Sequence, residues 1–278
     1  MINGIARAIS SSYHKVIKML KTIVETILGR EYRHFASPLS EGLVRLPYSG
    51  EYFNPGYVSR DTLGMREAHG YDIGGTLASA SDRDAVIRRL TRREDIRSDL
   101  FNNPDFTRQV SQFQEEGIRS GQITVAALEG VVSQLDGEKA KGHDTVLITV
   151  GTYQMARSFI HGAGLEDYVS ALVTSEEAGT GNMKTKEMFL QAYKALMAKG
   201  AVLVDYCDDV AAEAIAAVRA SQEIEREYGS GFKVYLVMRE AADSQVGRTP
   251  QGYTVIRNIS EKGQYDYQES AALTFTTS

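Results

Sequence analysis

The chain has 278 residues, of which 42% are hydrophobic and 24% charged, with a formal net charge of -5. This composition is that of an ordinary globular protein, with room for a sizeable core in one large domain or two small ones. The acidic balance argues against general nucleic-acid binding. The single cysteine, Cys207, excludes an intrachain disulfide and predicts a reducing, cytoplasmic location.

Residues 2–28 predict an amphipathic basic helix, because isoleucine, leucine and valine recur every three to four residues. Residues 1–30 sum to +4, with five lysines and arginines against the single acid Glu25. The pattern leaves three roles open: docking on the protein body or a protein partner, lying on a membrane surface, or targeting to an organelle. Together with a Tyr- and Gly-rich connecting segment, this N-terminal region spans residues 1–65.

Residues 80–140 have a helical pattern throughout, and from residue 146 onward short apolar runs alternate with helical segments. The predicted strands are 146–149, 171–173, 201–204, 234–238 and 253–256, and the predicted helices lie near 153–162, 185–198 and 210–226. Buried strands separated by helices are typical of a parallel sheet covered on both faces. The sequence therefore predicts a Rossmann-like, doubly wound α/β fold with its ligand site at the carboxyl ends of the strands. Residues 262–278 are expected to form a polar tail or an added edge element.

Three acids in five residues, Asp205, Asp208 and Asp209, follow the apolar run at 201–204 and precede a helical segment. Carboxylates clustered on the turn from a strand into a helix can hold Mg²⁺ near a phosphate. A solvated helix N-terminus, where the helix dipole favours aspartate, is the alternative explanation.

Two further segments offer groups that could bind phosphate. Thr149 ends a predicted strand and is followed by Gly151, so that a hydroxyl and backbone N–H groups can surround phosphate oxygens. Lys184 precedes the helix near 185–198 and could neutralise a phosphate or a nucleophilic carboxylate, with Lys186 competing for that role. A helix cap and a surface lysine are the simpler interpretations.

The segment Asp72-Ile73-Gly74-Gly75-Thr76-Leu77 combines an acid with a glycine-rich turn and a threonine. Covalent catalysis by aspartate needs a carboxylate exposed at a strand end, with a metal and cations to reduce repulsion of an incoming phosphate. The alternative is an ordinary turn that contains aspartate.

Taken in order, these segments resemble the haloacid dehalogenase-like (HAD-like) superfamily over about residues 66–261. The segment 72–77 is similar to the first motif of that superfamily, Asp-x-Asp-Gly-Thr-Leu. Thr149 is similar to the second motif, Lys184 to the third, and Asp205 with Asp209 to the acidic fourth. The resemblance implies a core at 66–79 and 141–261, and a helical cap at 80–140 inserted after the first strand.

The resemblance also implies a chemistry. Asp72 would attack phosphorus and form an aspartyl-phosphate, while Thr149 and Lys184 would hold the phosphoryl oxygens and Asp72. Asp72, Asp205 and Asp209 would position Mg²⁺. The implied activity is a Mg²⁺-dependent phosphatase acting on a small phosphorylated or otherwise anionic metabolite, and a homo-oligomeric state is left open.

Two features depart from the pattern. Gly74 stands where phosphatases of the superfamily place a second aspartate, the general acid and base. Branches that cleave carbon–halogen or carbon–phosphorus bonds also lack that aspartate, so they form one alternative. The residues before Asp72 include Arg66, Glu67 and His69, which fit poorly in a strand buried on both faces. A catalytically inactive member serving as a binding or assembly subunit is therefore the other alternative.

The remaining charged features carry weaker predictions. His69, His143 and His161 show no metal-ligand spacing and are expected to be structural or exposed. The arginine-rich stretch between residues 83 and 97 either contacts an anionic substrate or forms a solvated helix face.

Overall fold

The computed structural model describes residues 44–45, 52–53, 64–81, 85, 88, 103–180 and 183–265. The chain divides into two units, residues 1–36 and 37–278, and every described residue belongs to the second. The predicted helix at 2–28, part of the predicted cap and most of the predicted tail lie outside the described residues. Within the described part, no helix combines the length and apolar character needed to cross a lipid bilayer.

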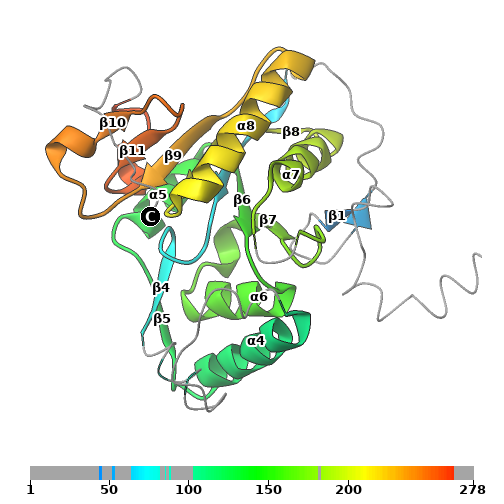
Figure 1. Cartoon of the computed structure of the whole chain (residues 1–278), viewed down its shortest axis with the longest axis vertical. Coiled ribbons are helices and arrows are strands. Elements are labelled where there is room, and N and C mark those ends of the chain that lie inside the picture. Colours follow the sequence, from blue (N-terminus) through cyan, green and yellow to red (C-terminus); the bar gives the residue numbers. More distant parts are fainter. Residues whose placement is uncertain are drawn as a thin grey trace, which may run out of the picture. The chain divides into compact units, whose positions relative to one another are not determined.

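A seven-stranded sheet forms the centre of the described part, with the strand order β10-β11-β9-β8-β3-β6-β7 (Figure 1). The strands are β3 (Arg66–Tyr71), β6 (Asp144–Thr149), β7 (Val169–Thr174), β8 (Ala201–Asp208), β9 (Lys233–Val237), β10 (Gly247–Arg248) and β11 (Thr254–Ile256). Neighbouring strands are parallel except for β10 and β11. This topology confirms the predicted Rossmann-like α/β fold.

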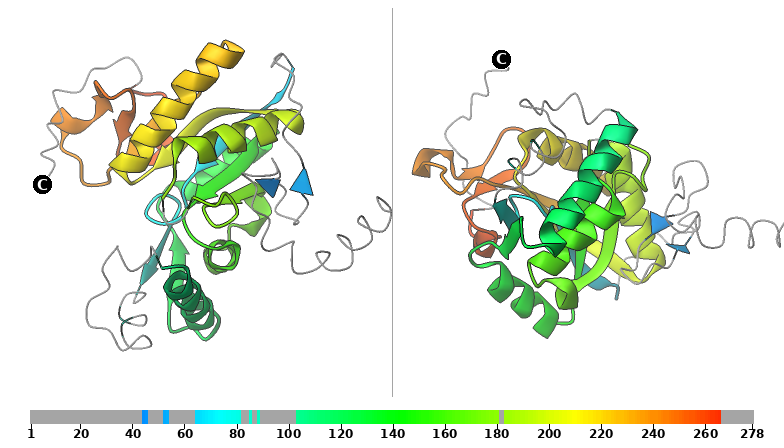
Figure 2. Two further views of the ribbon diagram at one scale, coloured as in Figure 1. Left: turned by 45° about the vertical axis from the view of Figure 1, so that its right-hand side comes forward. Right: turned by 90° about the horizontal axis from the view of Figure 1, so that it is seen from below.

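Helices cover both faces of the sheet, as Figure 2 shows in its left view. They are α5 (Val131–Ala140), α6 (Tyr153–Gly162), α7 (Lys186–Ala198) and α8 (Ala211–Tyr228). Short 3-10 turns lie at Glu166–Tyr168, Asp243–Gln245 and Ile259–Glu261. A separate two-stranded sheet joins β1 (Val44–Arg45) and β2 (Tyr52–Phe53).

The two faces of the sheet build two separate cores because side chains alternate along each strand. Val146 and Ile148 of β6 pack with α7 and α8, whereas Leu147 between them packs with α5 and α6. A strand that is apolar on both faces therefore appears as an uninterrupted apolar run in the sequence, which is the signal that predicted it.

Strand β3 lies between β8 and β6, and its polar residues are accommodated where it begins. Arg66 and Glu67 are exposed, and Arg66 pairs with Asp144 at 3.0 Å between Nη2 and Oδ2. The half-buried His69 has its Nδ1 2.8 Å from Oδ2 of Asp205 on β8. The polar residues of β3 that precede Asp72 are thus compatible with a central strand, because each of their polar groups reaches solvent or a hydrogen-bond partner.

The insert after β3 is not helical throughout, contrary to the sequence-based prediction. β4 (Ala78–Ser81) pairs antiparallel with β5 (Thr124–Ala127), and α4 (Pro104–Arg119) lies between them in the chain. Ile123 and Val125 are buried while Thr124 and Ala126 are exposed, which is the alternation of a half-buried strand. Helix α5 therefore begins only at Val131, after this strand and a turn.

Candidate active site

Asp72 directly follows β3 at the carboxyl edge of the sheet, and its backbone N–H donates to the Cys207 carbonyl at 2.9 Å. Thr149 ends β6 on one side, and Asp208 ends β8 on the other. After β3, the chain first forms its neighbour β6 and only later forms β8, the neighbour on the other side. Such a point, where the strand order reverses, is where open α/β sheets form their ligand crevice.

Lys184 connects the acids of this crevice. Its Nζ lies 2.8 Å from Oδ1 of Asp72 and 2.7 Å from Oδ2 of Asp208, and it also contacts Oε2 of Glu213. Only 1% of the Lys184 side chain is exposed. Burial lowers the pKa of this lysine, but the charges of the three carboxylates outweigh burial, so the net pKa is raised and Lys184 stays an ammonium.

The carboxylate of Asp208 is fully buried and fixed on several sides. Its Oδ2 lies 2.6 Å from the Tyr206 hydroxyl as well as near Lys184, and its Oδ1 accepts from the Val210 N–H at 2.9 Å. Tyr206 and Asp208 stand two residues apart on one strand, so their side chains point to the same face. Asp208 is therefore a rigid element that orients Lys184.

Thr149 and Gly151 both line this crevice, but they have different hydrogen-bond partners. The Thr149 side chain hydrogen-bonds the Asp72 carboxylate. The Gly151 N–H, expected to be available for phosphate, donates instead to the Ser175 hydroxyl at 2.9 Å. Gly151 has φ 112°, and an added Cβ would lie 2.0 Å from Cε of Met155. Its role here is conformational rather than as a phosphate donor.

Carboxylate oxygens of Asp72, Asp208 and Asp209 lie within 4.8 Å of one another. Oxygen ligands at such spacing suit Mg²⁺. Gly75 makes room for this arrangement, because a Cβ there would come within 1.9 Å of Oδ2 of Asp209. Burial, reinforced by the charges of Asp72 and Asp208, raises the pKa of Asp209 to about 6. The negative charge around Asp209 therefore outweighs the positive charge of Lys184. A bound cation would compensate this excess of negative charge.

Asp205 does not belong to this group, contrary to its predicted role as a metal ligand. It lies within β8 rather than at its end, and it contacts His69 and Lys262, with Oδ1 3.1 Å from the lysine Nζ. The ammonium of Lys262 and the hydrogen bond from His69 lower the pKa of Asp205 against the raising effect of burial. Because β8 continues to Asp208, the acid that faces Asp72 is Asp208.

Glu213, on the first turn of α8, is a functional candidate that the sequence reasoning missed. It lines the crevice and contacts Lys184. Burial raises its pKa to about 7, with Lys184 opposing and Asp208 adding to the effect. Its position four residues after Asp209, on the first turn of the helix that follows the acidic segment, is the signal that could have identified it. Lys186 instead pairs with Glu223 at 2.7 Å and takes no part in the site.

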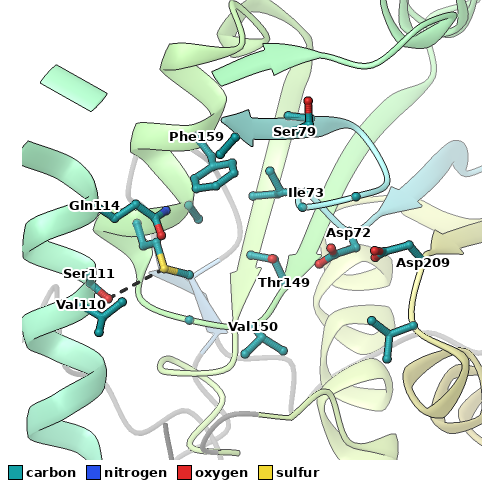
Figure 3. A pocket seen from close by; sticks show the side chains of 18 of the residues that line it. Asp72, Ile73, Ser79, Val110, Ser111, Gln114, Thr149, Val150, Phe159 and Asp209 are labelled. Carbon is teal, nitrogen blue, oxygen red and sulfur yellow. Dashed lines mark hydrogen bonds between the residues drawn. The ribbon is translucent and has the colours of Figure 1, made fainter. Parts of the chain in front are cut away.

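A cavity of about 800 Å³ opens over these acids (Figure 3). Asp72 and Asp209 lie at one end, and Val110, Gln114 and Phe159 line the other, from α4 and α6. Arg88, from the arginine-rich stretch, also lines the cavity. The site thus combines a charged end, where chemistry can occur, with a mixed apolar and polar end that can select a substrate.

No family model and no curated protein matches the sequence. Several solved structures are similar to it. CbbY from Rhodobacter sphaeroides, in complex with phosphate, is 12% identical with a TM-score of 0.48, over 72% of this chain and 97% of that one. A HAD hydrolase of family IA, variant 3, from Entamoeba histolytica is 13% identical with a TM-score of 0.48, over 70% and 94%.

A third similar structure is YfnB from Bacillus subtilis, described as a HAD-hydrolase and bound to magnesium. It is 12% identical with a TM-score of 0.45, over 71% of this chain and 96% of that one. Identities and TM-scores this low say nothing of reaction or substrate, for which the site geometry is the evidence.

Proposed function

We propose that this protein is a HAD-like, Mg²⁺-dependent hydrolase that uses Asp72 as its nucleophile and acts on a small phosphorylated metabolite. The observation that carries the proposal is the position of the Asp72 carboxylate. It lies at the charged end of the cavity, 2.8 Å from a buried ammonium and beside Asp208 and Asp209. The proposed nucleophile and metal-binding acids thus converge from the ends of β3 and β8, and the cation comes from the segment just before α7.

In the proposed reaction, a carboxylate oxygen of Asp72 forms a bond to phosphorus as the bond to the leaving oxygen breaks. Water then attacks the aspartyl-phosphate, which releases phosphate and restores the carboxylate. Burial raises the pKa of Asp72, while Lys184 and the Thr149 hydroxyl favour its ionised, nucleophilic form. Mg²⁺ held by Asp72 and Asp209, with Asp208 beside them, would neutralise charge on the phosphoryl oxygens.

The cavity supports a small anionic substrate. Its volume of about 800 Å³ falls within the range of small-molecule sites, and Arg88 adds a cation to its lining. Gly74 contributes no acid to protonate the leaving oxygen. We therefore propose substrates whose leaving group departs without protonation, such as acyl phosphates, ahead of alkyl phosphates.

The test compares acetyl phosphate with an alkyl phosphate, with and without Mg²⁺, in the wild type and in Asp72→Asn. The proposal predicts Mg²⁺-dependent release of phosphate that Asp72→Asn abolishes. Asp205→Asn is the matched control, because it removes an acid of the same five-residue segment outside the cavity. Folded Asp205→Asn protein should keep its Mg²⁺ dependence, whereas Asp209→Asn should lose it.

Gly74 supports a second candidate, a protein of this fold that binds a ligand or partner without turnover. Such a protein would hydrolyse none of the phosphoester, halide and phosphonate substrates on a panel, yet would still bind a phosphate mimic together with Mg²⁺. Turnover of a halide or a phosphonate would instead assign the carbon–halogen or carbon–phosphorus chemistry. Deleting residues 2–28 then tests whether the predicted basic helix serves partner or membrane association.

A further inference from the structure

Three potential metal ligands meet at the opposite edge of the sheet from Asp72, where β3 and β6 begin. The Nε2 of His69 lies 3.0 Å from Nδ1 of His143, and Nε2 of His143 lies 3.7 Å from Oε2 of Glu67. The ligand atoms of the three residues all fall within 4.8 Å of one another. β3 and β6 are adjacent and parallel, which brings together residues that are far apart in the sequence.

A second carboxylate fixes the orientation of His69. Its Nδ1 lies 2.8 Å from Oδ2 of Asp205, so Nδ1 carries the proton and donates it to that oxygen. The Nε2 of His69 then accepts a hydrogen bond from Nδ1–H of His143 at 3.0 Å, and a cation bound between the two rings would take the place of that proton. A histidine whose far nitrogen donates to a carboxylate is the usual arrangement behind a metal-bound imidazole.

We propose that Glu67, His69 and His143 form a binding site for Zn²⁺, separate from the proposed active site. Two nitrogens bound tetrahedrally to Zn²⁺ stand about 3.3 Å apart, given Zn–N bonds of about 2.0–2.1 Å. The observed 3.0 Å separation of the two imidazole nitrogens needs only a small opening to reach that value. Glu67, whose Oε2 lies 3.7 Å from the other ring nitrogen of His143 and whose side chain is exposed, would turn to supply the third ligand, and water would take the fourth tetrahedral position.

The surroundings of the three ligands favour a cation and give it access. Buried Glu138 and Asp205 lie beside His69, and Lys262 contacts both acids from the side of Nδ1, away from His143. The side chains of His143 and Glu67 are 21% and 53% exposed, so the site opens to solvent at its outer rim. Imidazole nitrogen favours zinc over magnesium, which distinguishes this site chemically from the all-carboxylate group around Asp72.

The experiment measures Zn²⁺ binding to the metal-stripped full chain by competition with a fluorescent chelator. Millimolar Mg²⁺ is present to compete at the carboxylate site. The proposal predicts one equivalent of Zn²⁺ bound by the wild type and by Asp209→Asn. In His143→Gln the affinity should fall by at least ~100-fold, more than the 10–100-fold typical of outer-shell changes. Glu67→Ala should also weaken binding.

His161→Gln is the matched control. His161 is an exposed histidine that pairs with Glu166 at 2.8 Å, so its loss should leave Zn²⁺ affinity unchanged. Co²⁺ substitution gives an independent readout, because a tetrahedral site yields intense visible absorption that His143→Gln should abolish. Absence of Zn²⁺ binding in the wild type, loss of binding in Asp209→Asn, or unchanged binding in His143→Gln or Glu67→Ala would each overturn the assignment.

Discussion

Replacing Gly74 by aspartate tests whether the site lacks only a general acid. Gly74 lines the cavity two residues after Asp72, and an added Cβ would meet no atom within 4 Å. Its φ also lies outside the left-handed region that other residues avoid. The backbone and the surrounding space therefore accept a side chain there without strain.

The expected gain follows from what a general acid contributes. Proton transfer to a leaving group is worth about 10²–10⁴ in rate, or about 3–5 kcal/mol of transition-state stabilisation. We expect Gly74→Asp to raise kcat/KM for an alkyl phosphate by about that factor. The gain for acetyl phosphate should be far smaller, because its leaving group is a stable carboxylate that needs no proton. The assay is steady-state phosphate release with both substrates at saturating Mg²⁺.

Two variants control for shape and position. Gly74→Asn adds nearly the same volume without an acid and should give no gain. Gly75→Asp moves the acid by one residue, to a position with φ 76° and a Cβ only 1.9 Å from Oδ2 of Asp209. It should impair Mg²⁺ binding and activity. Equal rates for Gly74→Asp and Gly74→Asn on the alkyl phosphate would refute the view that one missing acid limits this site.

Three further predictions concern the buried charges. Lys184→Met leaves Asp72, Asp208 and Glu213 uncompensated and should cost about 3–5 kcal/mol of unfolding free energy. In urea denaturation the surface variant Lys186→Met should stay near wild type, and equal stability of both variants would contradict the role of Lys184. The folded-state pKa values of Asp209 and Glu213, about 6 and about 7, exceed their ordinary values of 3.8 and 4.5. The folded state therefore binds more protons, so metal-free stability from these groups is full below about pH 4 and is lost as pH rises through 6–7. The rise in Tm caused by Mg²⁺ should accordingly be larger at pH 8 than at pH 5, and a smaller rise at pH 8 would refute the assignment. Tyr206→Phe removes the hydroxyl 2.6 Å from Oδ2 of Asp208 and should cost about 1–3 kcal/mol in the same denaturation assay, whereas no loss would show that this contact does not fix Asp208.

The sequence predicted those parts of the fold that depend on local pattern. Strand β6 was recognisable because its apolar residues serve two cores at once. The strand β5 was missed because the alternation of Ile123 and Val125 with exposed residues is short and borders a helical pattern. Such short segments are decided by pairing with a distant strand, here β4.

The candidate site was likewise predictable only where it depends on local sequence pattern. Asp72, Thr149 and Lys184 were found because each follows a strand or precedes a helix in the expected order. Asp205 was predicted to bind the metal together with Asp209, because their spacing is similar to the acidic fourth motif and Asp205 follows an apolar run that suggests the end of a strand. Its actual partner, His69, lies 136 residues away in the chain. The residues around Asp205 do not indicate a contact with a residue so distant in the chain. The continuation of β8 to Asp208 could therefore not be predicted from the local sequence.

Formation of an aspartyl-phosphate at Asp72 tests the central claim most directly. The protein is mixed with acetyl phosphate and Mg²⁺, quenched in acid, and analysed by intact and peptide mass spectrometry. The account predicts one added phosphoryl group, located on the peptide containing Asp72, dependent on Mg²⁺ and absent in Asp72→Asn. Hydrolysis of acetyl phosphate with no phosphoryl group trapped on that peptide, or with the same rate in Asp72→Asn, would contradict it.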